Sequence, residues 1–387
     1  MKKLGVLMFL AISLAIVTAT YSGHEFPIYP SYYPQEIRIE PVDPTSAGRL
    51  LAGAEIHAYV GAEPAFAGTP PESVSYTESL GSFVVLSLNR SSPSVSKSDV
   101  GCQIAYAMME GLVETEERFV MHPYPVNPYH GDYLYHFDLA TNAKKRYRDI
   151  AVDALPELKV RAKGEIAHRF VRSRWPSETS EWDVALEQVD VRDLVNPYAF
   201  NVNGWQGPPW LKRGWFHAYV LLTEGVHDAS AKELVEGRLR RLQVGDYARI
   251  EEGINLEREL VSLLTRDCQR VVLGYTVRRE YFNSDFSNGI ENIAFDSHAG
   301  LNAAIFVRTV KLKDFPWNGW LRLGVNGKPS AAWNPIAGFT DEAGRLMWFT
   351  VGDPALFPEP YDDSWVLNRI GDVQSSMAKQ VDLTAGR

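Results

Sequence analysis

The sequence predicts a two-part globular protein of the α/β plus α+β class, in which an N-terminal α/β layer precedes a helical segment and an antiparallel β meander. Strand and helix patterns alternate in the first 160 residues, as in an α/β layer. Three helical patterns then follow one another, and extended patterns separated by turn signals fill residues 270–351. All ten tryptophans follow residue 160, whereas twelve of the eighteen tyrosines precede it. This change predicts an α/β domain over 24–156 and a Trp-rich α+β domain over 157–387.

The N-terminus has the three features of an export signal. Met1-Lys2-Lys3 is positively charged, residues 4–17 form a largely apolar run of 14, and Val17-Thr18-Ala19 supplies the small residues that a signal peptidase reads. A membrane-spanning helix needs about 20 apolar residues, so a retained anchor is the less favoured alternative. We therefore expect a signal peptide over residues 1–19 and a periplasmic or secreted mature protein without a transmembrane segment.

The first part contains four predicted elements. Residues 45–53 (TSAGRLLAG) begin with a Thr/Ser cap and end at Gly, which predicts a short helix. Residues 54–61 alternate between apolar and polar, and residues 81–89 form an apolar run, so both are predicted strands. Residues 97–114 begin with Ser98 or Asp99 as a cap and place apolar side chains at helical spacing.

Two stretches of this part are RLLAGAEIHAYVGAEPAF (49–66) and ESLGSFVVLSLNRSSPSVSKSDVG (78–101). They resemble the helix–strand step and the return strand of periplasmic solute-binding proteins of the phosphonate and phosphite type. The resemblance implies a binding-protein-like domain over 24–156, with His57 as a ligand-binding residue where that family often has Asp. The strand that opens the fold in that family is not recognisable before FPIYPSYYP (26–34).

The second part begins with two predicted strands, 157–170 and 182–195. Helical patterns cover residues 212–226, 229–243 and 249–266, and RVVLGYTVRREYF (270–282) is a predicted strand. Turn signals such as Asn326-Gly327 separate the strands of the predicted meander.

The stretch FVMHPYPVNPYHGDYLYHFD (119–138) contains three of the nine histidines and three prolines. Proline favours extended backbone, and a polyproline II path would put His122 roughly 25 Å from His130. A reversal at Asn127-Pro128, which is a turn-forming pair, is therefore needed to bring these two histidines together. Asp132 and His136 are four residues apart and share one face of a helix. His130 and His136 would point about 240° apart on a helix.

This geometry predicts a metal site in which an imidazole from the loop joins the carboxylate and imidazole one helical turn apart. Mixed imidazole and carboxylate ligands suit Cu or Zn as the cofactor. The predicted ligands are His122, His130, Asp132 and His136. Two alternatives remain open. A cleft could bind a small solute through Tyr124, Tyr129 and Tyr133, or Asp132 could simply cap a helix that begins at Tyr133.

Two other segments carry metal-ligand chemistry. His24 would chelate copper through its α-amine and imidazole if the signal were cleaved after Gly23. NSDFSNGIENIAFDSHAG (283–300) supplies oxygen ligands of the kind that Ca²⁺ prefers. Ile290 stands where the calcium helix–loop–helix template has Gly, so a hairpin loop with Asx turns is favoured there.

The stretch NGWQGPPWLKRGWFHAY (203–219) is aromatic and rich in Gly and Pro. Exposed tryptophans bind flat ligands by stacking and gather at interfaces, whereas buried ones fill gaps in the core. On the first interpretation Trp205 and Trp210 are candidate ligand-binding residues, and the Trp-rich part offers a docking surface for a membrane-complex partner.

Cys102 and Cys268 are the two cysteines of the chain. Such a pair can form a disulfide in an oxidising compartment. The bridge stays open at this point, because the sequence does not show whether the two Cα atoms come within about 7 Å.

Composition and missing motifs exclude several functions. A net charge of −9 without a long basic run argues against nucleic acid as a partner. The chain has no G-x-S-x-G, G-x-G-x-x-G or P-loop motif, and its cysteines form no C-x-x-C pair. We therefore predict an exported periplasmic protein that binds a small solute or a transition metal near residues 122–138. The alternatives are a periplasmic metal-dependent enzyme with the same His/Asp set and an accessory subunit of a membrane or redox complex.

Overall fold

The computed structural model describes residues 34–95, 98–149, 157–174, 181–198, 200–202, 205–316, 319–328, 341–352, 356–362, 364–368 and 371. The predicted signal peptide and His24 lie outside the described residues. No helix in the described part of the chain is long and apolar enough to cross a membrane.

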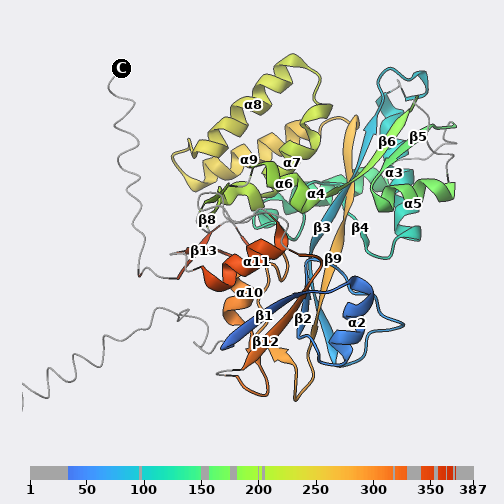
Figure 1. Ribbon diagram of the computed structural model, residues 1–387. Coiled ribbons are helices and arrows are strands. Elements are labelled where there is room, and N and C mark those ends of the chain that lie inside the picture. The colour runs from blue at the N-terminus through green and yellow to red at the C-terminus, as the bar shows by residue number, and fades with distance from the viewer. Residues whose placement is uncertain are drawn as a thin grey trace, which may run out of the picture.

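An eight-stranded mixed sheet forms the centre of the molecule (Figure 1). The strand order is β1-β12-β2-β9-β3-β6-β5, and β4 pairs with β9 outside this path. The β1–β12, β12–β2 and β5–β6 pairs are parallel, and the others are antiparallel. The strands are β1 (Glu36–Pro41), β2 (Ala58–Val60), β3 (Val74–Leu88), β4 (Phe119–Met121), β5 (Val160–Lys163), β6 (Val184–Asp190), β9 (Arg270–Asn283) and β12 (Trp320–Val325).

Helices cover this sheet and connect its strands. They are α2 (Pro44–Ala52), α3 (Ser98–Thr115), α4 (Tyr133–Arg148), α5 (Glu165–Arg174), α6 (Val191–Val195), α7 (Gly214–Leu222), α8 (Ala229–Val244), α9 (Ile250–Leu264), α10 (Ala304–Thr309) and α11 (Glu342–Val351). Three short antiparallel pairs lie outside this sheet: β7 (Phe200–Val202) with β8 (Trp205–Gly207), β10 (Ile290–Glu291) with β11 (Lys311–Leu312), and β13 (Leu356–Pro358) with β14 (Trp365–Leu367).

The two longest strands, β3 and β9, lie side by side along most of the sheet (Figure 1). Alternate side chains of a strand point to opposite faces, and β3 follows this rule closely. Phe83 and Val85 belong to the core beneath α7, α8 and α9, whereas Val84 and Leu86 belong to the core beneath α3 and α5. Because all four side chains are fully buried, β3 separates two hydrophobic cores.

Several helix boundaries follow from local chemistry. The Asp43 carboxylate accepts a hydrogen bond from the Thr45 N–H at the start of α2, and Pro44 occupies the first turn, where its missing N–H costs nothing. Asp228 caps α8 in the same way, and Gly245 ends that helix at φ +68°, a left-handed conformation that favours glycine. The helices predicted over 45–53, 229–243 and 249–266 are confirmed as α2, α8 and α9.

Three predictions for the second part are wrong. The strand expected over 182–195 ends at Asp190, whose side chain caps α6. The strand expected over 157–170 ends at Lys163, and the chain turns at Gly164 (φ +93°) into α5. The antiparallel meander expected over 270–351 is interrupted by α10 and α11. In that region β9 pairs with β3, and β12 lies between β1 and β2. These pairings join segments far apart in sequence, which local periodicity does not reveal.

The described chain is therefore a mixed α/β protein with a central mixed sheet. Four strands of this sheet come from residues 24–156 and four from residues 157–387. The boundary near residue 157 thus does not separate two sheets, and the division into two domains stays a prediction.

A disulfide joins Cys102 in α3 to Cys268 just before β9. The two Cα atoms are 5.3 Å apart, and the cysteines are 166 residues apart in sequence. The structure thus resolves the question that the sequence left open. The bridge ties a helix of the first predicted part to a strand of the second, and no free cysteine is left.

A cross-link over so long a loop restricts the unfolded chain, so we expect its removal to destabilise the protein. The Cys102→Ala/Cys268→Ala variant should lose about 2–5 kcal/mol in the free energy of unfolding. Urea denaturation under non-reducing conditions measures this loss, and wild-type protein with reductant should show a similar decrease. A variant within about 0.5 kcal/mol of the wild type would contradict the stabilising role.

Candidate metal centre

Residues 122–136 form a connection that bends twice between β4 and α4. The His122 N–H donates to the Leu273 carbonyl, so the segment starts alongside β9. The His130 N–H then donates to the Asn127 carbonyl at 3.0 Å, which closes a turn. The reversal predicted at Asn127-Pro128 is therefore present. It carries His130 and Asp132 into the interior, where both are at least 97% buried.

His122 is buried but lies apart from the other predicted ligands. Its Nε2–H donates to the Val126 carbonyl at 2.8 Å, within the same bend. Burial lowers the pKa of His122 to about 4, so the ring is neutral at pH 7. The ring lies against Tyr133 and Tyr275, with centroids 6.0 and 5.7 Å away.

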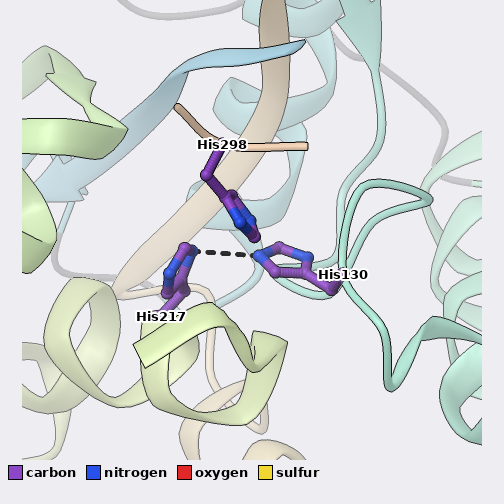
Figure 2. A group of neighbouring side chains, drawn as sticks. All are labelled: His130, His217 and His298. Atoms are coloured by element: carbon purple, nitrogen blue, oxygen red, sulfur yellow. Dashed lines mark hydrogen bonds between the residues drawn. The ribbon is translucent and has the colours of Figure 1, made fainter. Parts of the chain in front are cut away.

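Three histidines from three distant segments meet in the interior (Figure 2). His130 comes from the turn before α4, His217 from α7, and His298 from the loop after β10. The ring centroids are 4.7 Å apart for His130 and His217, 5.3 Å for His130 and His298, and 5.2 Å for His217 and His298. One nitrogen from each ring lies within 4.8 Å of the others, so this histidine group could hold a metal ion.

Hydrogen bonds fix the tautomers of two of these rings. The Asn127 N–H donates to His130 Nδ1 at 3.0 Å, so the proton of the neutral His130 ring is on Nε2. That Nε2–H donates to His217 Nδ1 at 2.9 Å, and His217 Nε2–H donates to the Leu211 carbonyl at 2.8 Å. The result is a directed chain of neutral imidazoles. His298 Nε2 is buried beside it without a hydrogen-bond partner.

Burial keeps this histidine group uncharged. It lowers the pKa of His130 to about 3, and it lowers the pKa values of His217 and His298 well below the ordinary value. His130 also lowers the pKa of His217, and both rings lower the pKa of His298.

Asp132 holds together two helices that are far apart in sequence. Its carboxylate accepts hydrogen bonds from the Gly214 N–H at 2.8 Å and the Trp215 N–H at 3.2 Å, the first two residues of α7. A carboxylate at a helix N-terminus satisfies orphan N–H groups and interacts favourably with the helix dipole. Asp132 directly precedes α4, yet its side chain makes no capping bond to that helix. Asp132 therefore does cap a helix, but that helix is α7 and not the expected α4.

His136 and Glu257 complete a second group around this carboxylate. His136 lies one turn along α4, and Glu257 comes from α9. The exposed fractions of Asp132, His136 and Glu257 are 0%, 0% and 7%, and their ligand atoms lie within 4.8 Å of one another. We call these three residues the carboxylate group. It also could hold a metal ion.

The imidazole of His136 has one nitrogen engaged and one available. His136 Nδ1 and the Tyr124 hydroxyl are 2.9 Å apart, and His136 Nε2 is buried with no hydrogen-bond partner. Burial lowers the pKa of His136 to about 4, although the nearby Asp132 carboxylate opposes this shift. A neutral ring that donates Nδ1–H to the tyrosine oxygen presents the Nε2 lone pair to the carboxylates.

The structure divides the four predicted metal ligands. Asp132 and His136 lie together, His130 joins the separate histidine group, and His122 lies in neither group. Sequence reasoning missed His217, Glu257 and His298. His217 and His298 do fall in stretches that the composition singled out, but Glu257 carries no local signal, because its partners are more than 120 residues away in sequence.

The aromatic residues predicted to bind a ligand pack into the structure. Tyr124 is buried against His136, and the ring of Tyr129 lies 5.8 Å from Tyr275. Tyr133 packs against the core, and the ring of Trp210 lies 4.6 Å from Phe216. The Trp205 side chain is outside the described residues. Ligand binding by these residues stays a prediction.

The segment 283–300 forms Asx turns. The Asp285 carboxylate accepts from the Ser287 and Asn288 N–H groups, and Asp296 Oδ1 accepts from the His298 and Ala299 N–H groups. The other oxygen of Asp296 binds Lys212 Nζ at 2.7 Å. The predicted Asx turns are therefore confirmed. The segment is not a hairpin loop, because β9 pairs with β2, β3 and β4, whereas β10 pairs with β11.

His57 lies away from both groups, just before β2. Its Nδ1 accepts a hydrogen bond from the Arg322 N–H at 2.9 Å, and its own backbone N–H donates to the Arg322 carbonyl at 2.7 Å. His57 thus connects β2 to β12. Burial, with the positive charge of Arg322, lowers its pKa to about 4. The role as a ligand contact stays a prediction.

No protein-family model and no curated protein matches the sequence. Several solved binding proteins are similar to part of the structure. The oligopeptide-binding protein AppA from Bacillus subtilis, solved with a nonapeptide, has a TM-score of 0.39 at 11% identity over 70% of this chain and 59% of its own. The periplasmic binding protein DppA from Helicobacter pylori, solved with the peptide STSA, has a TM-score of 0.41 at 13% identity. This match covers 70% of this chain and 56% of DppA. NikZ from Campylobacter jejuni, solved with Ni(L-His), has a TM-score of 0.35 at 13% identity. This match covers 67% of this chain and 58% of NikZ.

The chain thus covers less than two thirds of each of these proteins. The similarity is to binding proteins of the oligopeptide and nickel kind, and not specifically to the phosphonate type that two sequence stretches resemble. TM-scores below 0.5 at such low identity do not carry the ligands of these proteins over to this chain.

The lowered pKa of His57 predicts a loss of stability in acid. Between about pH 6.5 and pH 4 the unfolded chain binds a proton at His57 and the folded protein does not, so stability falls as the pH falls. The contribution of His57 between pH 7 and pH 5 should be about 2 kcal/mol. His57→Asn keeps an acceptor near the position of Nδ1. Urea denaturation of this variant should show a change in the free energy of unfolding between pH 7 and pH 5 that is smaller by this amount. An unchanged pH dependence would show that His57 titrates alike in both states.

Proposed function

We propose that the protein is an exported binding protein that holds one divalent transition-metal ion between Asp132, His136 and Glu257. The main support is that two buried carboxylates and a buried imidazole nitrogen without a hydrogen-bond partner lie within 4.8 Å of one another. Export is proposed from the charged start, the apolar run and the small residues at 17–19.

The charge of the carboxylate group suits a divalent ion. Two carboxylates close together in a poorly solvated interior repel each other, because the low local dielectric strengthens the interaction. The N-terminus of α7 partly compensates Asp132, and Arg213 Nη1 lies 3.9 Å from Glu257, at the limit of an ion pair. A divalent cation bound by two carboxylates and one neutral imidazole would leave the group without net charge. This mixed donor set fits Zn²⁺ and related ions.

The histidine group fits such an ion less well. The proton on His130 Nε2 occupies the nitrogen that faces His217, so a metal at that nitrogen would have to displace the proton and the Asn127 hydrogen bond. Three neutral imidazoles would also leave the whole charge of the ion in the interior. The carboxylate group is therefore the favoured binding site.

Burial of all three ligands favours binding over catalysis. A catalytic metal needs an open position that a substrate can reach. The exposed fractions of 0%, 0% and 7% instead describe ligands enclosed by α4, α7 and α9. The proposed role of the site is therefore to retain an ion within the protein.

We expect the metal-stripped full-length mature protein to bind one equivalent of Zn²⁺, measured by isothermal titration calorimetry and elemental analysis. Bound Zn²⁺ at 100 times its dissociation constant should add about 2.7 kcal/mol to the free energy of unfolding. His136→Asn keeps a partner for Tyr124 and removes Nε2. It should weaken binding by more than about 100-fold, because even the outer-shell partners of a ligand contribute 10- to 100-fold.

Two matched variants serve as controls. His298→Asn removes the buried Nε2 of the histidine group, and His227→Asn changes an exposed histidine. Both should bind Zn²⁺ as the wild type does. Loss of binding in His298→Asn but not in His136→Asn would assign the metal to the histidine group and overturn the proposal. Glu257→Gln provides an independent test of the second carboxylate.

A further inference from the structure

A polar cavity of about 750 Å³ is lined by none of the candidate metal ligands. Its walls come from β3, β6 and β9, from the turn between α3 and β4, and from the start of α5. The size is typical of cavities that take small molecules. We infer that this cavity binds a small solute through a carboxylate group, which Arg278 and Arg192 would recognise.

The inner wall carries two guanidinium groups beside one shared carboxylate. Arg278 Nη2 donates to Asp190 Oδ2 at 2.9 Å, and Arg192 Nε lies 3.5 Å from Asp190 Oδ1. The Arg278 side chain is only 9% exposed, and its Nη1 is buried without a hydrogen-bond partner. Leaving a charged donor unsatisfied is costly, so this nitrogen calls for an acceptor.

The charged groups at this wall are Arg278, Arg192, Asp190 and Glu280. Burial lowers the pKa of Arg192, and the nearby positive charge of Arg278 lowers it further. Glu280 lies close behind the wall, but its two oxygens accept hydrogen bonds from the Gly61 and Leu301 N–H groups at 2.6 Å each. Asp190 and Glu280 oppose this shift in Arg192, so a ligand carboxylate would mainly supply the acceptor that Arg278 Nη1 lacks.

The two guanidinium groups on the rim of the cavity are paired with rim carboxylates, which outnumber them. Arg118 contacts Glu63, and Arg169 lies 3.3 Å from Glu116 and 3.6 Å from Glu165. Because the rim guanidinium groups are already paired, Arg278 and Arg192 on the inner wall would bind the charged group of a ligand. The surplus of rim carboxylates would repel a dianion such as phosphate, whereas a monoanionic carboxylate matches the flat guanidinium fork.

Uncharged polar groups complete the wall. Thr276 Oγ1 accepts from the Ser82 N–H at 3.1 Å, and Gln188 Nε2 donates to Ser82 Oγ at 3.2 Å. These groups hold one another in place next to Arg278. A lining dominated by polar side chains favours a small hydrophilic solute over a lipid or an aromatic ligand.

Full-length mature protein should be titrated with acetate, glycine and succinate, using calorimetry and thermal melting. Acetamide, which has the shape of acetate without its charge, is the matched control, and inorganic phosphate is the competing anion. We expect saturable binding of at least one carboxylate and no response to acetamide. Arg278→Lys keeps the charge but loses the fork, and it should weaken that binding roughly tenfold or more.

Arg192→Lys tests the second guanidinium group. If Arg278→Lys fails to fold, this variant alone shows whether the inner wall binds the carboxylate. Arg169→Lys, on the rim, should bind within about twofold of the wild type. Failure of all three carboxylates to bind would overturn the inference. So would tighter binding of phosphate, or unchanged binding in Arg192→Lys. These variants should not affect Zn²⁺ binding. The result for the cavity can therefore be judged separately from the result for the metal site.

Discussion

The contact between Asp132 and the first two N–H groups of α7 determines how the interior around both metal-ligand groups is arranged. A fully buried carboxylate is stable only with hydrogen-bond partners, and the Gly214 and Trp215 N–H groups provide them. The contact fixes α4 against α7, so that His136, one turn along α4, faces the interior. It also places His130, two residues earlier in the chain, beside His217 on α7.

The paired strands β3 and β9 place the two proposed sites in different parts of the molecule. The face of β3 that carries Phe83 supports the helices that provide the metal ligands, and Phe83 itself lies against the ring of His130. Farther along, β9 supplies Arg278 to the polar cavity and Glu280 to the layer behind it. Gly300, at φ +66°, lets the loop after β10 approach Glu280 more closely than a residue with a Cβ atom could. The lining of the cavity shares no residue with the two metal-ligand groups.

Local sequence patterns predicted the features that depend on neighbouring residues. Caps and periodicity gave α2, α8 and α9, and the four-residue spacing of Asp132 and His136 gave half of the carboxylate group. What depends on distant contacts was missed. The approach of α9 brings Glu257 to this pair, and the pairing of β9 with β3 replaces the expected meander. The partner of Asp132 is 82 residues away, and no local pattern indicates it.

Anomalous X-ray diffraction at the zinc absorption edge, from crystals of the Zn²⁺-loaded protein, would locate the bound ion. We expect one strong peak enclosed by Asp132, His136 and Glu257, about 2.0–2.2 Å from one ligand atom of each. A peak among His130, His217 and His298 instead, or no peak at either group in fully loaded protein, would rule out the carboxylate group as the metal site.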